Sequence, residues 1–176
     1  MERTLRSTRA FSGRLISLRV DEVERSDGVR ATREIVEHPG AVAILAWDGA
    51  RVAMVRQWRH AAGDVLLEIP AGTTEAGEEP LATARRELAE EMGIGAASWT
   101  IGPGFYTAPG FCTEHLTLFL ATELDEVETP MPDDEQIERA WLSIDEALGA
   151  IDEGRIADAK SIAGILWLAQ RVAVSD

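Results

Sequence analysis

The sequence predicts an α+β fold with an antiparallel β-ribbon at the N-terminus. Two Asp-Gly pairs, at residues 27–28 and 48–49, each separate runs rich in β-branched residues, which is a strong signal for a hairpin. Helical patterns or boundaries occur over residues 80–92, 144–152 and 158–172. Because strands and helices do not alternate regularly, an α+β or sandwich layering is favoured.

The N-terminal region is predicted to be a ribbon. Residues 15–24 and 29–38 flank the first Asp-Gly pair and alternate moderately between apolar and polar side chains. An isolated two-stranded ribbon is marginal in water, so this one must pack on its own domain or on a second subunit. We therefore predict that residues 1–38 form a dimerisation ribbon and that residues 39–176 form the main domain. The basic start of the chain, residues 1–11, is expected to be a frayed tail.

The main domain is predicted to begin with two central strands around the second Asp-Gly pair. A short strand over residues 65–72 follows and stops at Pro70, and the helix over 80–92 has a first-turn proline and stops at Gly93. Glycine and proline are expected to break residues 98–111 into strand fragments and a loop. The remaining predicted elements are strands 114–124 and 138–144 and helices 144–152 and 158–172.

Composition and charge narrow the class of protein. The 176 residues are 45% hydrophobic, which suits one compact domain with a buried core. The net charge of −14 would repel nucleic-acid phosphates, so nucleic-acid binding is not expected. The acidity fits either solubility or carboxylates that hold hard cations. A single cysteine, Cys112, and the lack of a signal peptide or an apolar membrane-spanning run predict a soluble cytoplasmic protein.

Three carboxylates on the helix over residues 80–92 are the most informative feature. Glu87, Glu90 and Glu91 lie within about a third of the helix circumference, since each residue advances by 100°. Like charges at this spacing repel, so a stable fold must neutralise them with water, basic groups or metal ions. Ligation by oxygen alone selects hard ions. Taken by itself, such a cluster is more often a solvated acidic helix face.

The residues around this cluster favour the metal. They follow the pattern G-x5-E-x7-R-E-U-x-E-E-x-G-U from Gly72 to Ile94, where U is a bulky aliphatic residue. A chance match at any one starting point is on the order of one in 10⁸. The pattern resembles the complete Nudix box, so the chain is identified as a member of the Nudix hydrolase superfamily. That resemblance implies metal-dependent hydrolysis of a diphosphate linkage. It also implies the Nudix fold, an α+β fold in which mixed β-sheets are sandwiched between α-helices.

The resemblance also implies roles for the box residues. The metal, Mg²⁺ or Mn²⁺, would be held by the carbonyl of Ala71 and by Glu87, Glu90 and Glu91. Arg86 would fix the orientation of a helix carboxylate. For Glu78, a capping or structural role is as well supported as a chemical one.

Segments outside the box resemble the ADP-ribose and ADP-sugar pyrophosphatase branch. They are residues 33–40, 55–59, 67–72 and 108–114, with Pro109 sixteen residues after Gly93. The implied reaction is hydrolysis of ADP-ribose to AMP and ribose 5-phosphate, or of a related nucleoside diphosphate sugar, by a homodimer. The alternatives are a Nudix hydrolase acting on a dinucleoside polyphosphate or a nucleoside triphosphate, and a non-catalytic module that senses ADP-ribose.

Substrate contacts follow from the same resemblance. Arg59 would hold a phosphate or the terminal ribose, with a strand-end surface arginine as the alternative. Phe111 would stack on the substrate or anchor the core. Either Glu90 or the loop residue Glu114 would be the general base. Glu114 could instead be a further metal ligand or a solvated loop glutamate. Adenosine contacts, in part across a dimer interface, are assigned to Arg33, Glu34, Arg14 and Glu75.

Several other residues are expected to have no chemical role. Ala108 and Cys112 stand where a hydroxyl residue is more usual in this branch, which puts hydrogen bonds to the sugar in doubt. The three histidines, His38, His60 and His115, lack metal-binding spacing. Asp158 and Lys160 resemble the closing segment of the branch and are expected to support the fold.

Overall fold

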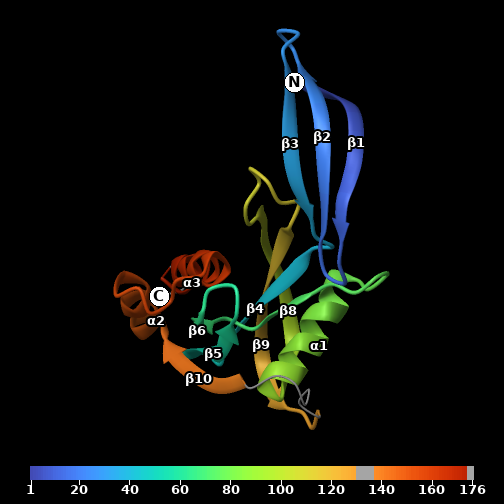
Figure 1. The fold of residues 1–176 in the computed structure, drawn as a ribbon. Helices are drawn as coiled ribbons and strands as arrows, with labels where there is room; N and C mark the ends of the chain where they lie inside the picture. The colour runs from blue at the N-terminus through green and yellow to red at the C-terminus, as the bar shows by residue number, and fades with distance from the viewer. Residues whose placement is uncertain (130–136, 174–176) are drawn as a thin grey trace. The chain divides into compact units, whose positions relative to one another are not determined.

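The chain divides into two compact units in the computed structural model, which describes residues 1–129 and 137–173. The N-terminal unit comprises residues 1–40 and 105–115, and the main unit comprises residues 41–104 and 116–176. The N-terminal unit contains one antiparallel sheet with the strand order β1-β2-β3 (Figure 1). Its strands are β1 (Glu2–Ser12), β2 (Ser17–Arg25) and β3 (Arg30–Glu37).

The expected hairpin is present, but the expected frayed tail is not. Strands β2 and β3 join through a turn in which Gly28 has a φ of 80°. The tail prediction was wrong because residues 2–12 form β1, which pairs along β2. Every residue of β1 is exposed, so the strand lacks the apolar alternation by which a sequence reveals a strand. Its ion pairs Arg3–Glu24 and Arg9–Glu37, each 2.8 Å long, are between residues far apart in sequence.

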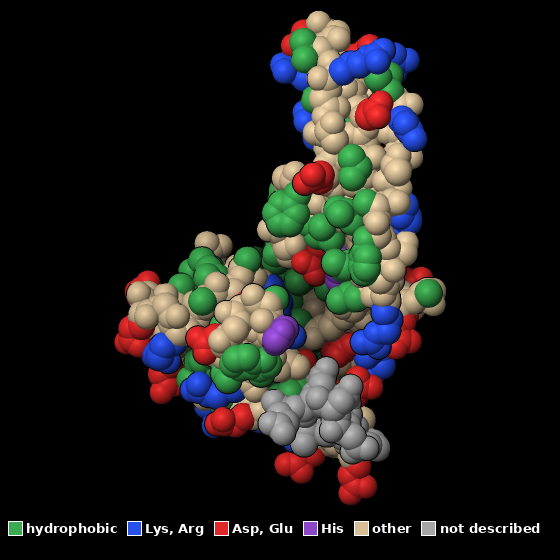
Figure 2. Space-filling view, in the orientation of Figure 1, with side chains coloured by type: hydrophobic (Ala, Val, Ile, Leu, Met, Phe, Trp, Pro, Cys, Tyr) green, Lys and Arg blue, Asp and Glu red, His purple; other side chains and the backbone are tan. Residues whose placement is uncertain are grey.

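The charge of the N-terminal unit differs from that of the whole chain. Residues 1–40 contain eight arginines and seven carboxylates, so their net charge is +1 and the rest of the chain carries −15. In Figure 2, side chains of both signs are spread along this sheet. Residues 107–114 attach to the end of β3, where the Val36 N–H donates to the Phe111 carbonyl (2.8 Å) and the Thr113 N–H donates to the Val36 carbonyl (2.9 Å).

The main unit contains two sheets and three described helices. One sheet has the order β7-β4-β9-β8, with β4 and β9 parallel, and the other has the order β10-β5-β6. The strands are β4 (Ala41–Ala46), β5 (Arg51–Arg59), β6 (Asp64–Glu68), β7 (Ala71–Thr73), β8 (Ile94–Tyr106), β9 (His115–Glu126) and β10 (Ile137–Ser143). The helices are α1 (Pro80–Met92), α2 (Ile144–Asp152) and α3 (Ala159–Val172), so all three predicted helices are confirmed.

Strand β8 corrects the prediction of broken fragments over residues 98–111, because it is continuous from Ile94 to Tyr106. Gly102 of this strand allows close packing. A Cβ at Gly102 would lie 3.1 Å from Leu118 Cβ and 3.2 Å from the Trp167 ring. The sequence shows glycine as a breaker, whereas the packed structure uses its small size. The short strand predicted to stop at Pro70 is β6, which ends at Glu68, and a separate strand, β7, begins after the proline at Ala71.

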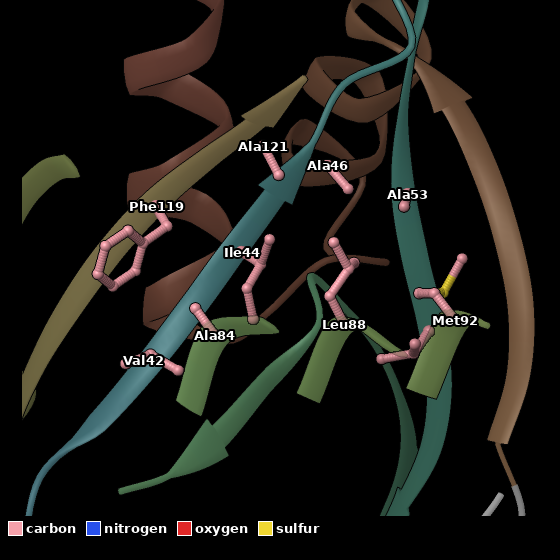
Figure 3. Close-up of a cluster of buried hydrophobic side chains, with 10 residues drawn as sticks. Val42, Ile44, Ala46, Ala53, Ala84, Leu88, Met92, Phe119 and Ala121 are labelled. Carbon is pink, nitrogen blue, oxygen red and sulfur yellow. The ribbon is translucent and has the colours of Figure 1, made fainter. Parts of the chain in front are cut away.

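Strand β4 lies at the centre of the main unit and is buried on both faces. Val42 and Ile44 belong to the cluster that includes Ala84, Leu88 and Met92 of α1 (Figure 3). On the other face, Leu45 lies against α3, where a Cβ at Gly164 would be 3.3 Å from Leu45 Cδ2. Mixed sheets between helices are therefore confirmed for the main unit. None of the described helices has both the length and the apolar character of a membrane span.

Candidate active site

Helix α1 holds the three predicted carboxylates near its packed face. Leu88 is fully buried, and Glu91 on the next turn is only 4% exposed. The side chains of Glu87 and Glu90 are 14% and 29% exposed. A solvated acidic face would leave its carboxylates far more accessible, so that alternative does not describe this helix.

Glu91 is fixed by the backbone that precedes the helix. Its Oε2 accepts a hydrogen bond from the Ala71 N–H at 3.1 Å, and its own carbonyl accepts one from Arg139 Nε at 2.8 Å. A buried carboxylate is costly unless it is hydrogen-bonded, and the backbone of β7 supplies such a bond. Ala71, the predicted carbonyl ligand, therefore lies beside a predicted carboxylate ligand.

Gly72 lies directly against Glu87. A Cβ at this position would overlap Cγ, Cδ and Oε1 of the Glu87 side chain. Only glycine allows the carboxylate to approach the β7 backbone so closely. The first residue of the box and its helix are thus brought into contact, although fourteen residues separate them.

Arg86 links the remaining carboxylates of the box. Its Nη1 lies 2.7 Å from Glu87 Oε1 and 3.1 Å from Glu90 Oε2. Its Nε and Nη2 are each 3.2 Å from one oxygen of Glu78. The expected contact between Arg86 and helix carboxylates is present, and the guanidinium also ties the loop before α1 to the helix.

Glu78 holds this loop in shape. Its Oε2 accepts from the Glu75 N–H at 3.2 Å, and its N–H donates to the Glu75 carbonyl at 3.0 Å. Hydrogen bonds from Arg86 lower the pKa of Glu78 to about 2 and raise the pKa of Arg86. Glu79, not Glu78, is the N-cap of α1, and it makes no side-chain capping bond. This geometry favours a structural role for Glu78 over a capping role.

The residues of this site suit a divalent cation. Its donors are carboxylate and carbonyl oxygens, the set that hard ions prefer. In the described residues, no three His, Cys, Asp or Glu side chains already converge to metal-binding geometry. Instead, Arg86 contacts Glu87 and Glu90, and the Ala71 N–H contacts Glu91. The close approach of Glu87 to Gly72 is the observation that fits a built site, because a side chain there would fill the space.

Comparison with known families agrees with this geometry. The family model described as NUDIX domain matches residues 37–164, and the model described as nucleoside diphosphate sugar hydrolase N-terminal domain matches residues 2–36. The chain belongs to the Nudix family. Nudix hydrolases generally use divalent metal ions, and this Nudix protein has the oxygen donors for one.

Individual relatives extend the match to nearly the whole chain. An ADP-ribose pyrophosphatase of Bacillus subtilis (strain 168) is 42% identical over 170 residues, which cover 95% of this chain and 92% of the relative. A methanol dehydrogenase activator of Bacillus methanolicus is 41% identical over 172 residues, with the same two coverages. A solved structure, titled as the crystal structure of an ADP compounds hydrolase, has a TM-score of 0.88 at 19% identity and covers 99% of this chain and 95% of its own. That last likeness confirms the predicted Nudix fold.

Arg59 of this Nudix protein ends β5 and is paired with a buried carboxylate. Its Nη2 lies 2.6 Å from Glu68 Oε2, and its Nε is 3.1 Å from both Glu68 oxygens. Lys160 Nζ approaches the same Oε2 at 2.7 Å and also contacts Asp158 Oδ1 at 2.8 Å. Burial acts to raise the pKa of Glu68, but hydrogen bonds from Arg59 and the charge of Lys160 outweigh it, so the pKa is lowered.

Glu114 belongs to the N-terminal unit and is held there by neighbours. Thr107 Oγ1 lies 2.6 Å from Glu114 Oε2, and His38 Nδ1 lies 3.6 Å from Glu114 Oε1. His38 Nδ1 also accepts a hydrogen bond from the Gly40 N–H at 3.1 Å. Glu114 is therefore a restrained side chain and not a freely solvated one.

The predicted adenosine contacts are divided between the two units. Arg33 is on β3 and pairs with Glu2, while Glu34 next to it is exposed. Arg14 is exposed between β1 and β2, and Glu75 is exposed in the loop before α1 of the main unit. Their roles stay predictions.

The exposure of Phe111 excludes one of its two predicted roles. Phe111 is 59% exposed, so the alternative of a core anchor was wrong. A role in stacking on the substrate stays a prediction, since aromatic side chains are left exposed where they bind ligands as well as elsewhere.

Sequence reasoning missed Glu68, gave Lys160 only a fold role, and missed Thr107. Each makes its main contact with a residue of another element or loop, so no local spacing marks it. A lysine in the first turn of a predicted helix was the one available signal, because a cation is unfavourable there.

Proposed function

We propose that this protein hydrolyses the diphosphate bond of ADP-ribose, giving AMP and ribose 5-phosphate, or that of a closely related nucleoside diphosphate sugar. The observation that carries the proposal is the connected cluster of box residues in the main unit. Gly72 contacts Glu87, Ala71 contacts Glu91, and Arg86 joins Glu78, Glu87 and Glu90. The relative named ADP-ribose pyrophosphatase, similar over 95% of the chain, supports ADP-ribose as the first substrate to test.

We propose that Mg²⁺ or Mn²⁺ is held by the carbonyl of Ala71 and by the carboxylates of Glu87, Glu90 and Glu91. A divalent ion bound there would neutralise phosphate charge and make bound water more acidic. Arg86 pairs with Glu87 and Glu90 and fixes the directions of their carboxylates. An acidic protein would otherwise repel a substrate that carries two phosphates, which is why these carboxylates need a cation.

The other side chains act on the substrate and the proton. Arg59 binds a phosphate or the terminal ribose, Phe111 stacks on the substrate, and Arg33, Glu34, Arg14 and Glu75 contact adenosine. Glu90 and Glu114 are the two candidates for the general base that takes a proton from water. Replacing each by glutamine separates them, since the base variant loses the acidic limb of its dependence on pH, whereas the other keeps it.

We also propose that the N-terminal unit mediates a homodimer in the cytoplasm. The family model for nucleoside diphosphate sugar hydrolase N-terminal domains covers residues 2–36, which supports a shared role for this segment. Sedimentation equilibrium of the full chain would test the dimer. A monomer at micromolar concentration would contradict it.

The decisive experiment is a panel assay of the purified protein on ADP-ribose, NADH, GDP-mannose and Ap4A, with and without Mg²⁺. Specificity is scored by kcat/KM, the quantity by which enzymes discriminate substrates. We expect the highest value for ADP-ribose, and activity only with the metal. Strong cleavage of another compound without cleavage of ADP-ribose would overturn the substrate.

One observation favours a second candidate, a regulatory module that binds ADP-ribose. The Bacillus methanolicus relative is named for the activation of another enzyme. Isothermal titration distinguishes the two candidates, because a sensor binds ADP-ribose tightly without turnover. Turnover in the panel assay would reject the sensor as the primary function.

A further inference from the structure

A buried charge cluster lies at the start of α3 and includes Arg59. Its members are Arg59, Glu68, Asp158 and Lys160, referred to below as the α3 charge cluster. The Glu68 side chain is 3% exposed and that of Lys160 is 13% exposed, whereas that of Arg59 is 36% exposed. The cluster is therefore buried at Glu68 and reaches the surface at Arg59.

Both cations meet at one carboxylate oxygen. Arg59 Nη2 and Lys160 Nζ lie 2.6 Å and 2.7 Å from Glu68 Oε2. Lys160 Nζ also lies 2.8 Å from Asp158 Oδ1, so Glu68 is held from the α3 side as well as by Arg59. The direction of the Arg59 guanidinium is therefore fixed by a carboxylate that Lys160 itself fixes.

The position of Lys160 is unfavourable for the helix itself. It is the second residue of α3, next to the positive end of the helix dipole, where a cation is destabilising. Burying a lysine and a carboxylate together also carries a desolvation cost that their attraction only roughly offsets. Support of the helix is thus a poor explanation for Lys160.

The first turn of α3 also forms a hydrogen bond with the segment that leads into the site. Ser161 is fully buried, and its Oγ accepts from the Ile69 N–H at 2.8 Å. Lys160 holds Glu68, the residue before Ile69, and Ala71 and Gly72 follow two and three residues after Ile69. The start of α3 therefore holds both Arg59 and the backbone that contacts Glu87 and Glu91.

We propose that Lys160 is a positioning residue for substrate binding: it shares Glu68 Oε2 with Arg59, fixes that carboxylate, and so holds the Arg59 guanidinium aimed at a phosphate of the substrate. The inference rests on the proposed function, in which Arg59 binds the phosphate or the adjoining ribose. Without Lys160, Glu68 and the Arg59 guanidinium that it orients lose their fixed direction, and the affinity of the site for an anion falls.

The test measures binding apart from turnover. The dissociation constant for a methylene-bridged, non-hydrolysable analogue of ADP-ribose is measured by isothermal titration on the full chain with Mg²⁺. Lys160→Met should weaken binding about tenfold, the effect of one charge-assisted hydrogen bond, and raise KM for ADP-ribose similarly. The kcat should stay within about threefold, because the contact is made to bound substrate as well as to the transition state.

A double-mutant cycle shows whether Lys160 acts through Glu68. Glu68→Gln should weaken binding by a similar factor, and adding Lys160→Met to it should weaken binding no further. The double variant also removes both buried charges, so it stays informative if Lys160→Met alone fails to fold. Lys160→Arg should restore binding, since its guanidinium can bond Glu68 as well. Arg155→Met, which removes an exposed cation paired with Glu153, is the matched control and should change nothing.

The outcomes separate this inference from the proposed function. If the wild-type protein neither binds nor hydrolyses ADP-ribose, the proposed function fails. If the wild type binds but Lys160→Met only lowers the melting temperature and leaves the dissociation constant unchanged, the inference alone fails. Additive losses in the cycle would also overturn it.

Discussion

The substitution Gly72→Ala isolates the contact between β7 and α1. The Cβ of alanine would overlap Cγ, Cδ and Oε1 of Glu87, and carbon atoms pack at about 3.5–4 Å, so the carboxylate must retreat by roughly 1 Å or more. Gly72 has no positive φ that alanine would strain. A displacement of this size in a catalytic group costs about 10²-fold in rate, so we expect kcat to fall about 10²-fold.

The assay is the initial rate of AMP release from ADP-ribose at saturating Mg²⁺, with the melting temperature measured in parallel. Gly149→Ala is the matched control. It makes the same change within α2, where nothing lies within 4 Å of the new Cβ, and it should leave kcat unchanged and stabilise the helix by up to about 1 kcal/mol. If Gly72→Ala keeps kcat within threefold of the wild type, the Glu87 contact is not needed for catalysis and the reasoning is refuted.

Three further substitutions test other parts of the structure. Glu91→Gln keeps the shape of the buried side chain and should lower kcat by about 10³ or more, and near wild-type turnover would reject Glu91 as a metal ligand. Arg86 lowers the pKa of Glu78 to about 2, so Glu78 stabilises the fold above its unfolded pKa near 4.5 and loses this effect as the pH falls toward 2. Glu78→Gln should therefore lower the free energy of unfolding in urea at pH 7 but much less at pH 3. An equal loss at both pH values would contradict the ion pair. Ser143→Ala removes the capping box with Glu146 and should cost about 1 kcal/mol in urea unfolding with kcat unchanged, and an unaltered midpoint would show that the cap adds nothing.

Local signals in the sequence were enough to predict the secondary structure around the site. The boundaries of α1 follow from Pro80 and Gly93, whose φ of 65° needs no neighbour beyond the helix itself. The hairpin at Gly28 likewise depends on a few consecutive residues. The spacing of Glu87, Glu90 and Glu91 predicted the candidate site because a helix of known pitch places such residues on one side.

Pairing between distant segments could not be predicted from these local signals. Strand β1 was missed because it is exposed throughout and its partners on β2 lie up to 23 residues away. Strand β8 was predicted as fragments because the close packing of Gly102 on Leu118 and Trp167 exists only after folding. In both, the stabilising contacts are non-local, and a residue pattern records only what each segment prefers alone.

The sequence by itself determined the fold family, the helix with its three glutamates and the box that they complete, because these depend on residues within one turn or one loop of each other. The tertiary structure alone decided that Gly72 contacts Glu87 and that Lys160 meets Glu68 from 92 positions away. A charge is buried only where packing brings it a partner, so the identity of that partner is a property of the folded chain.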